Sequence, residues 1–511
     1  MKVATVMLSD PDTLDPGRAD DDQKNSIVLE AQETLFRYID GELTEAGCES
    51  YETSEDGLTW TFHLRDNKYS DGEEVKAQDY VNSIRRIFDP EVNCHNAGIF
   101  YCIAGGEAFN TGAGSKEDVG AVAVDDKTLE ITLVEPIPYF AQLMTFSNVT
   151  PVPESKTEGE KNSSYGATAE ELAQSGPFYV SEWTRGSKVV LKKNENYWDG
   201  EVPLDKVTLK CVDDQTTRSM ALQTGEIDIA YNLKTENLIE FEGNDNYEIQ
   251  ELQSLRSTYA FMNQSEGRAL SDKALRQALL RGLDKQTYCD VLLEGGATAG
   301  KAPVPPTLDF GFDDLNDENS YDPEGAKAIL EEAGYKDTDG DGFVETPDGD
   351  PLTLDFVIYT SRAELGVYAQ AAQASLKEIG INVNLNTVSY ETLLDMRDSG
   401  QYDLLIWNVL VANTGDPENY LRENWYSKSA NNTAGYNNPE VDELLDELAG
   451  TFDEEERKDL IIKIQQDIMD DAATVFFGYE TTYLFSNKRV TGVKMYPMDY
   501  YWLTKDITLA E

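Results

Sequence analysis

Closely spaced carboxylates are the feature of this sequence most suited to chemistry. Residues 337–342 read Asp-Thr-Asp-Gly-Asp-Gly, which puts oxygen ligands at positions one, three and five of a loop and glycine at position six. That spacing lets a loop wrap around a hard cation such as calcium. Position twelve is Asp rather than the bidentate Glu, and the flanking segments are a predicted helix and a predicted strand. We predict a structural calcium site, with an unliganded acidic turn as the alternative; the ligands would be Asp337, Asp339, Asp341 and Asp348.

Motifs for catalysis are scarce. Residues 295–301 spell Gly-x-x-x-x-Gly-Lys, but Ala302 stands where a phosphate-binding loop needs Ser or Thr, and the segment follows a predicted helix instead of a strand. The sequence contains neither Gly-x-Ser-x-Gly nor His-Glu-x-x-His, and its only histidines are His63 and His95. A glycosidase-like pair of carboxylates stays open in so acidic a chain, without a local signature. We predict that the protein is not an enzyme and needs no cofactor besides the calcium ion.

Composition limits the class of protein. The chain has 511 residues, which is too long for one core and predicts two or three domains. Its 42 Lys and Arg residues against 96 Asp and Glu give a net charge of −54, which excludes nucleic acid and anionic membrane surfaces as partners. Five cysteines, an odd number without zinc-site spacing, form no dense disulfide framework, although Cys94 and Cys102 could pair.

The second half of the chain alternates between strand and helix patterns. We predict a strand, a helix, a strand, a helix and a strand at residues 352–359, 363–379, 381–388, 390–397 and 402–407. This order implies a parallel sheet with right-handed crossovers. The loops after its strands would therefore meet at one edge of the sheet.

Two stretches in the first half carry a resemblance to a known family. Residues 175–200 read SGPFYVSEWTRGSKVVLKKNENYWDG and alternate around an Arg-Gly turn, as an antiparallel hairpin does. Residues 64–90 run Leu-Arg-x-x-x-Tyr-Ser-Asp-Gly-x-x-Val into an amphipathic helix that an Asp-Pro ends. In this order they resemble the signatures of extracytoplasmic solute-binding protein family 5, the oligopeptide- and dipeptide-binding proteins of ABC importers.

The resemblance implies an α/β fold of two lobes, the periplasmic-binding-protein-like class with an extra inserted domain, mixed sheets and a hinge. We expect the first lobe to collect residues 1–40, 165–255 and 485–511. Residues 41–164 would form an inserted satellite domain, and residues 256–484 would form the second lobe.

The resemblance also implies where the ligand is bound. Peptide-binding relatives use a Tyr-Asn pair, an aromatic residue and an arginine in the helix before the last parallel strand, and a strand and loop that match WNVLVANTGD at residues 407–416. For Tyr390 and Trp407 the alternative is ordinary core packing, and for Arg397 it is a surface position. The candidate ligand-binding residues are Tyr231, Asn232, Tyr390, Arg397, Trp407, Val409, Val411, Asn413, Asp416 and Asp22.

One position departs from the family pattern. Relatives place an Asp shortly before the Asp-Pro of this loop, where it pairs with the peptide's α-ammonium group, and Asn413 occupies that place here. An amide accepts a hydrogen bond but carries no charge. Either the ammonium group meets another acid, such as Asp21 or Asp22, or the ligand is not a free peptide amine.

From the resemblance we expect a monomeric binding subunit that captures oligopeptides between its lobes and delivers them to an ABC permease. It would work outside the cytoplasm, as a periplasmic protein or a cell-surface lipoprotein. Met1 and Lys2 lead directly into a strand-like segment, so we expect the leader of the exported protein to be missing from this sequence. The alternatives are a binder of oligosaccharide or metal chelate, with nickel disfavoured by the scarcity of histidine, and an acid-rich hydrolase.

Overall fold

The structure is a computed structural model that describes residues 3–7, 10–39, 41–212, 214–231, 233, 235–359, 362–412, 414–495 and 505–510. The chain forms two compact units, Met1–Leu252 with Tyr483–Glu511 and Gln253–Thr482. We call these unit 1 and unit 2. The chain passes between them within the long strands β12 (Tyr247–Met262) and β17 (Thr474–Asn487). These crossings lie within a few residues of the expected lobe boundaries.

Unit 1 contains the sheet that the hairpin pattern predicted. Its strands run in the order β1-β10-β9-β8, where β9 pairs antiparallel with both neighbours and β1 pairs parallel with β10. The turn between β8 and β9 contains Gly186 at φ +66°, a conformation that glycine adopts without strain. The strands are β1 (Val3–Met7), β8 (Phe178–Thr184), β9 (Lys188–Lys193) and β10 (Lys206–Cys211).

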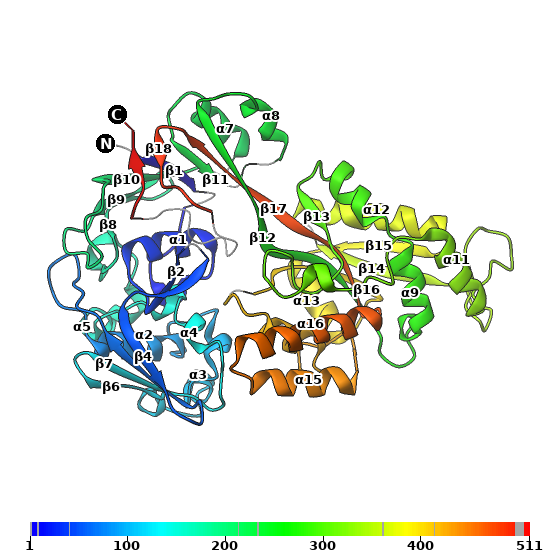
Figure 1. The fold of residues 1–511 in the computed structure, drawn as a ribbon, viewed down its shortest axis with the longest axis horizontal. Coiled ribbons are helices and arrows are strands. Elements are labelled where there is room, and N and C mark those ends of the chain that lie inside the picture. Colours follow the sequence, from blue (N-terminus) through cyan, green and yellow to red (C-terminus); the bar gives the residue numbers. More distant parts are fainter. Residues whose placement is uncertain are drawn as a thin grey trace. The chain divides into compact units, whose positions relative to one another are not determined.

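Residues 41–164 of unit 1 have their own sheet, in the order β4-β5-β7-β6 (Figure 1). They supply most of a hydrophobic core that Leu35, Phe36 and Ala173 complete from outside this range. Helix α2 packs against this sheet through Tyr80, Ile84 and Phe88. Separation of this segment as a satellite domain stays a prediction, because it falls within unit 1. The elements are β4 (Cys48–Thr53), β5 (Thr59–Leu64), α2 (Ala77–Ile87), α3 (Gly106–Asn110), β6 (Ala121–Asp125), β7 (Thr128–Thr132), α4 (Phe140–Leu143), α5 (Glu154–Thr157) and α6 (Lys161–Ser164).

The remaining elements of unit 1 are short. They are α1 (Asp22–Ala31), β2 (Phe36–Ile39), β3 (Glu42–Glu45), α7 (Gln215–Gln223), β11 (Ile229–Tyr231), α8 (Leu238–Phe241), β18 (Val490–Thr491) and β19 (Thr508–Leu509). Strand β11 pairs antiparallel with the last residues of β17.

Unit 2 is built on the predicted parallel strands. Strand β14 (Thr353–Tyr359) pairs parallel with both β15 (Asn382–Val388) and β16 (Leu404–Leu410), so the βαβαβ prediction is confirmed. Antiparallel β12 continues the sheet beyond β16, which makes the sheet mixed. The intervening helices are α12 (Ala363–Glu378), which packs on β14 and β15, and α13 (Tyr390–Ser399).

The other elements of unit 2 surround this sheet. They are α9 (Lys273–Arg281), α10 (Lys285–Thr287), β13 (Ala297–Ala299), α11 (Pro323–Glu332), α14 (Glu418–Trp425), α15 (Pro439–Ala449) and α16 (Glu454–Asp470). Strand β13 lies inside the Gly-x-x-x-x-Gly-Lys segment and pairs with β17, and Lys301 donates to the Leu315 carbonyl, so this segment is not built as a phosphate-binding loop.

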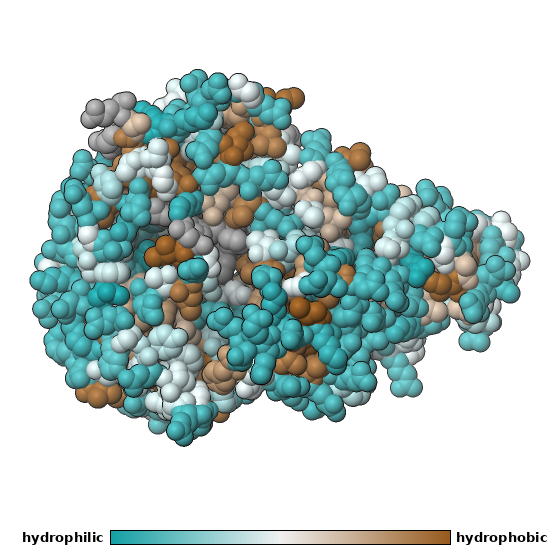
Figure 2. Space-filling model, in the orientation of Figure 1, coloured by the Kyte–Doolittle hydropathy of each residue, from teal (hydrophilic) through white to brown (hydrophobic). Residues whose placement is uncertain are grey.

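Hydrophilic side chains cover most of the visible surface (Figure 2), as the net charge of −54 leads one to expect. In the described residues, no helix is both long and apolar enough to cross a membrane. No disulfide joins any of the five cysteines, all of which are described, so Cys94 and Cys102 do not form the bridge that the sequence allowed.

Candidate functional site

The carboxyl ends of the parallel strands of unit 2 carry most of the predicted site. Strands β14, β15 and β16 end at Tyr359, Val388 and Leu410, and each is followed by a loop or helix that presents polar or aromatic side chains. In open α/β sheets, ligands bind beyond this edge because the loops that follow the strands meet there.

Three aromatic rings and one guanidinium group form what we call the aromatic shelf: Tyr359, Tyr390, Arg397 and Trp407. The ring centroids of Tyr390 lie 5.4 Å from Tyr359 and 6.1 Å from Trp407, and Arg397 Cζ lies 5.1 Å from the Trp407 ring centroid. Tyr390 is 47% exposed, whereas Tyr359 is buried, and burial raises the pKa of Tyr359 to about 12. Three residues predicted from the sequence are thus brought together, with Tyr390 as the exposed member.

A charged cluster at the same edge of the sheet is formed by Arg256, Arg362, Asn408 and Glu480. Asn408 Nδ2 donates to Glu480 Oε1 at 2.6 Å, and Arg256 Nη1 donates to Asn408 Oδ1 at 3.3 Å. The guanidinium nitrogens of Arg362 and Arg256 lie 3.5 and 3.8 Å from the Glu480 carboxylate, longer than the 2.7–2.9 Å that is usual for a charge-assisted hydrogen bond. Burial raises the pKa of Glu480, although both arginines oppose that shift. A charged ligand group could therefore compete for these loosely held partners.

None of the four residues of this cluster was predicted from the sequence, although Trp407, which precedes Asn408 in the chain, was. Its members come from β12, β16, β17 and the start of α12, and Arg256 and Glu480 are far apart in the chain. The available signal was weak: Glu480 interrupts an aromatic, strand-like stretch at residues 475–485.

The residues of the predicted strand and loop at 407–416 differ in how far they are exposed. Val409 is half-buried, whereas Val411 and Asp416 are buried. Both carboxylate oxygens of Asp416 are in use, because Oδ1 accepts from the Glu418 backbone nitrogen and Oδ2 accepts from Arg457 Nε and Nη2. The structure gives Asp416 a structural role, and its predicted ligand contact stays untested.

The remaining predicted ligand residues lie in unit 1 or outside the described residues. Tyr231 ends β11 in unit 1, is half-buried, and accepts a hydrogen bond from Arg218 Nη1 at its carbonyl. Asn232 and Asn413 lie outside the described residues, as does the side chain of Asp22, the first residue of α1. The predicted roles of these three residues are therefore not tested.

The predicted calcium loop does gather acids, but with a different fourth member. Carboxylate oxygens of Asp337, Asp339, Asp341 and Glu345 all lie within 4.8 Å of one another. Asp348 is not among them, and Glu345, at position nine of the loop, takes its place. Glu345 is buried, and its Oε2 accepts from the backbone nitrogen and hydroxyl group of Thr338. Oxygen donors of this kind suit calcium, and occupancy of the site stays a prediction.

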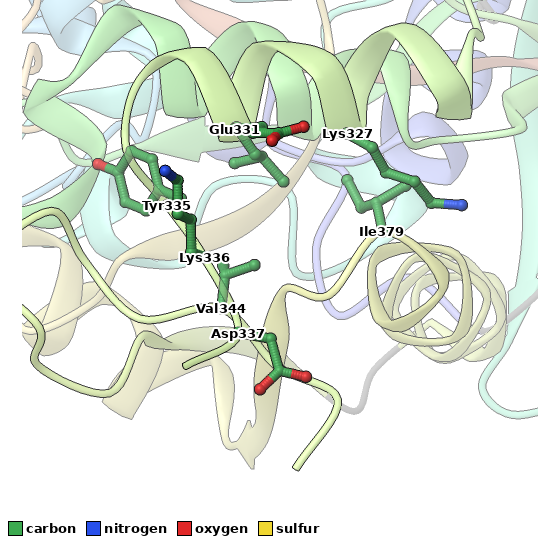
Figure 3. A pocket seen from close by; sticks show the side chains of 8 residues that line it. Lys327, Glu331, Tyr335, Lys336, Asp337, Val344 and Ile379 are labelled. Atoms are coloured by element: carbon green, nitrogen blue, oxygen red, sulfur yellow. The ribbon is translucent and has the colours of Figure 1, made fainter. Parts of the chain in front are cut away.

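A shallow pocket of about 230 Å³ adjoins this acidic turn (Figure 3). Lys327 and Glu331 of α11 line one side, and Val344 and Ile379 contribute apolar surface. In Figure 3 the carboxylate of Asp337 points away from α11. The pocket and the acidic cluster therefore do not converge on one ligand position.

Comparisons with known proteins agree with the architecture. A profile of the family "Bacterial extracellular solute-binding proteins, family 5 Middle" matches residues 42–432. The oligopeptide-binding protein OppA of Bacillus subtilis (strain 168) is 30% identical over 488 residues, which cover 93% of this chain and 87% of that protein. The solved structure of the periplasmic murein tripeptide binding protein MppA in its unliganded open form superposes with a TM-score of 0.83 at 22% identity, covering 99% of this chain and 97% of that one.

A nickel ABC transporter protein from Bacillus halodurans is also similar, with a TM-score of 0.80 and 26% identity, covering 99% of both chains. The fold class predicted from the sequence is confirmed by these likenesses. Because the family profile spans most of the chain and the relatives are matched over nearly their whole length, the protein belongs to the bacterial extracellular solute-binding proteins of family 5.

Proposed function

We propose that this protein is the ligand-binding subunit of an ABC importer and that it captures oligopeptides outside the cytoplasm without changing them chemically. Family membership and the names of the relatives support transport binding as the class of function. An ABC permease in the membrane would receive the ligand, and we propose that the protein acts as a monomer. The single observation that carries the choice of site is that residues at the carboxyl ends of β14 and β16 contribute to both the aromatic shelf and the charged cluster.

The two parts of the site suit different parts of a peptide. The exposed ring of Tyr390 offers apolar area for a ligand side chain at low conformational cost. Arg362 and Glu480 provide opposite charges at the same edge of the sheet, which suit the terminal groups of a zwitterionic ligand. Main-chain pairing with an extended peptide would leave side-chain pockets tolerant of sequence.

Isothermal titration with a series of short unmodified peptides tests this proposal. Tyr390→Ala should weaken binding by about 0.5–1.5 kcal/mol, the range for one aromatic contact. Tyr321→Ala is the matched control, because Tyr321 is also 47% exposed in unit 2 but lies outside the shelf. Equal effects of the two substitutions, or a lack of saturable binding to any peptide, would refute the proposed site.

A metal chelate is the second candidate, and the likeness to a nickel transporter protein favours it. Native mass spectrometry of the purified protein distinguishes capture of peptides from capture of a metal chelate. Release of a family of peptide masses supports peptide capture, whereas a single metal-containing mass supports the chelate. Appearance of cleaved products during incubation with peptides or oligosaccharides would refute a pure binding role.

A further inference from the structure

A polar cavity of about 220 Å³ lies in unit 1 between α2 and residues 154–162. One face of α2 packs into the core through Tyr80, Ile84 and Phe88. Asn82, Arg85 and Asp89 lie on another stripe of the same helix and on the turn that follows it. They line this partly open cavity and are half-buried. A polar stripe on a helix of this kind ordinarily faces water, so the covering segment needs an explanation.

Hydrogen bonds hold the covering segment at two places along α2. Asn82 Nδ2 donates to the Val152 carbonyl at 2.9 Å and to Thr157 Oγ1 at 3.0 Å. Farther along, Arg86 Nε donates to Asn162 Oδ1 at 2.9 Å, and Asn162 Nδ2 donates to Asp89 Oδ2 at 2.8 Å. Arg85 lies between these two attachments in the sequence of the helix.

Three arginines of the described residues, Arg85, Arg218 and Arg281, have a buried Nε without an acceptor. Arg218 and Arg281 each donate through another nitrogen, to the carbonyls of Tyr231 and Glu318, whereas no side-chain hydrogen bond or ion pair is found for Arg85 in the described part of the chain. A buried, charged N–H group without an acceptor is rare in folded proteins and points to a water molecule or an ion that satisfies it. The cavity is large enough to hold such a group.

The acids around the cavity do not supply that acceptor. Both oxygens of Asp89 are in use, by the Glu91 backbone nitrogen and by Asn162. Glu154 lies 3.6 Å from Lys116 Nζ, and Glu91 and Glu158 are exposed. A guanidinium group presents N–H donors in a planar fork that matches carboxylate and phosphate oxygens.

We propose that this cavity is a binding site for a small oxyanion, a carboxylate or a phosphate, held by Arg85, with Lys116 as a second cation among the residues that line the cavity. The exposed acids beside it repel a doubly charged anion more than a singly charged one, so a monocarboxylate binds better than phosphate at neutral pH. The site is made entirely of unit 1 residues, and it is independent of the shelf and the charged cluster.

Nuclear magnetic resonance of the arginine Nε–H groups tests the proposal on the whole chain. Sodium acetate and sodium phosphate are titrated separately at constant ionic strength, with sodium chloride as the reference. We expect one Nε–H resonance, identified by its loss in Arg85→Gln, to move saturably with acetate and more weakly with phosphate. Arg85→Gln should weaken acetate binding by about tenfold or more, measured by thermal shift, because the charge-assisted bonds are lost. Lys192→Gln, which removes an exposed positive charge on β9, should leave binding unchanged.

Three outcomes would overturn the proposal. The Arg85 resonance fails to move, it moves equally with chloride, or the Arg85→Gln variant binds acetate as tightly as the parent protein. If that variant does not fold, Lys116→Gln takes its place, and an acetate affinity that is unchanged in the folded Lys116→Gln protein counts against the site. A stronger response to phosphate than to acetate would assign the site to phosphate and refute the preference for carboxylate.

Discussion

Replacing Arg457 with Met should destabilise unit 2 strongly, because two buried carboxylates would lose their partner. Arg457, Asp416 and Glu418 are 5%, 7% and 3% exposed. Arg457 Nη2 donates to Asp416 Oδ2 at 2.7 Å and to Glu418 Oε2 at 2.9 Å, and Nη1 donates to the carbonyls of Leu448 and Thr451. The guanidinium group thus links α16 to the start of α14.

The size of the effect follows from burial. Removing one partner of a buried ion pair costs about 3–5 kcal/mol, because the remaining charge is neither hydrated nor neutralised. For a unit of this size, that loss corresponds to a fall in melting temperature of roughly 6–20 °C. The free energy of unfolding should be measured for the unit 2 transition by calorimetry, since a protein with two units need not unfold in one step.

The dependence on pH gives a second, independent check of the same substitution. Burial raises the pKa of Glu418, and Asp416 adds to that rise while Arg457 opposes it. Without Arg457 the Glu418 carboxyl group takes up a proton more readily in the folded state. The destabilisation should therefore be largest near neutral pH and should shrink as the pH falls and Glu418 becomes neutral.

Lys458→Met on the same helix is the control, since Lys458 pairs with the exposed Asp309 at 2.8 Å and a surface pair contributes little. Two results would refute the reasoning. One is an Arg457→Met effect no larger than that of Lys458→Met, and the other is a destabilisation that grows as the pH is lowered.

Three further predictions concern single residues. Burial raises the pKa of Glu30 to about 8 from 4.5, so its contribution to the stability of unit 1 is present below pH 4.5 and is lost as the pH rises through about 8. Glu30→Gln should therefore flatten the fall in the free energy of unfolding between these pH values. An unchanged slope would contradict this prediction. Calcium chloride should raise the melting temperature of unit 2 in the parent protein and in Asp348→Asn but not in Glu345→Gln. Calorimetry of the three proteins with calcium and with a chelator measures this difference. Gly166→Ala should lower the melting temperature of unit 1, because Gly166 has φ +79° and a Cβ there would lie 2.1 Å from the Asp15 backbone nitrogen. Gly200→Ala is the control for the cost of the backbone conformation alone, because Gly200 has φ +81° and a Cβ there would meet no atom within 4 Å. Equal losses in melting temperature would count against a steric clash at Gly166.

Much of the local structure could be predicted from the sequence. The helix pattern at residues 363–379 and the strand pattern at 381–388 match α12 and β15 to within one residue, because the periodicity of apolar residues records which side of each element is buried. The last strand was placed at residues 402–407, whereas β16 spans Leu404–Leu410, because its half-buried final residues lack an alternating pattern. The family assignment was also within reach, since it depends on short motifs that are continuous in the chain.

The candidate site was only partly predictable. Tyr390, Arg397 and Trp407 were identified by resemblance, and the structure brings them together. Arg256 and Glu480 could not be paired from the sequence, because they come from different strands that meet only after the sheet has formed. Asp416 was predicted as a ligand contact, and nothing in the sequence indicated its buried hydrogen bonds to Arg457, which lies 41 positions away.

The sequence by itself determined the class of fold and membership of the family, because the motifs that carry the resemblance are continuous in the chain. It also determined the strand-helix order at residues 352–407, because apolar periodicity and turn residues act over a few neighbouring positions. Only the tertiary structure decided which charges are partnered. The pairing of Glu480 with two arginines, the burial of Asp416, the replacement of Asp348 by Glu345 and the isolation of Arg85 all depend on how distant segments pack. Electrostatic partners are set by distances across the fold, and these distances are not encoded in any local pattern.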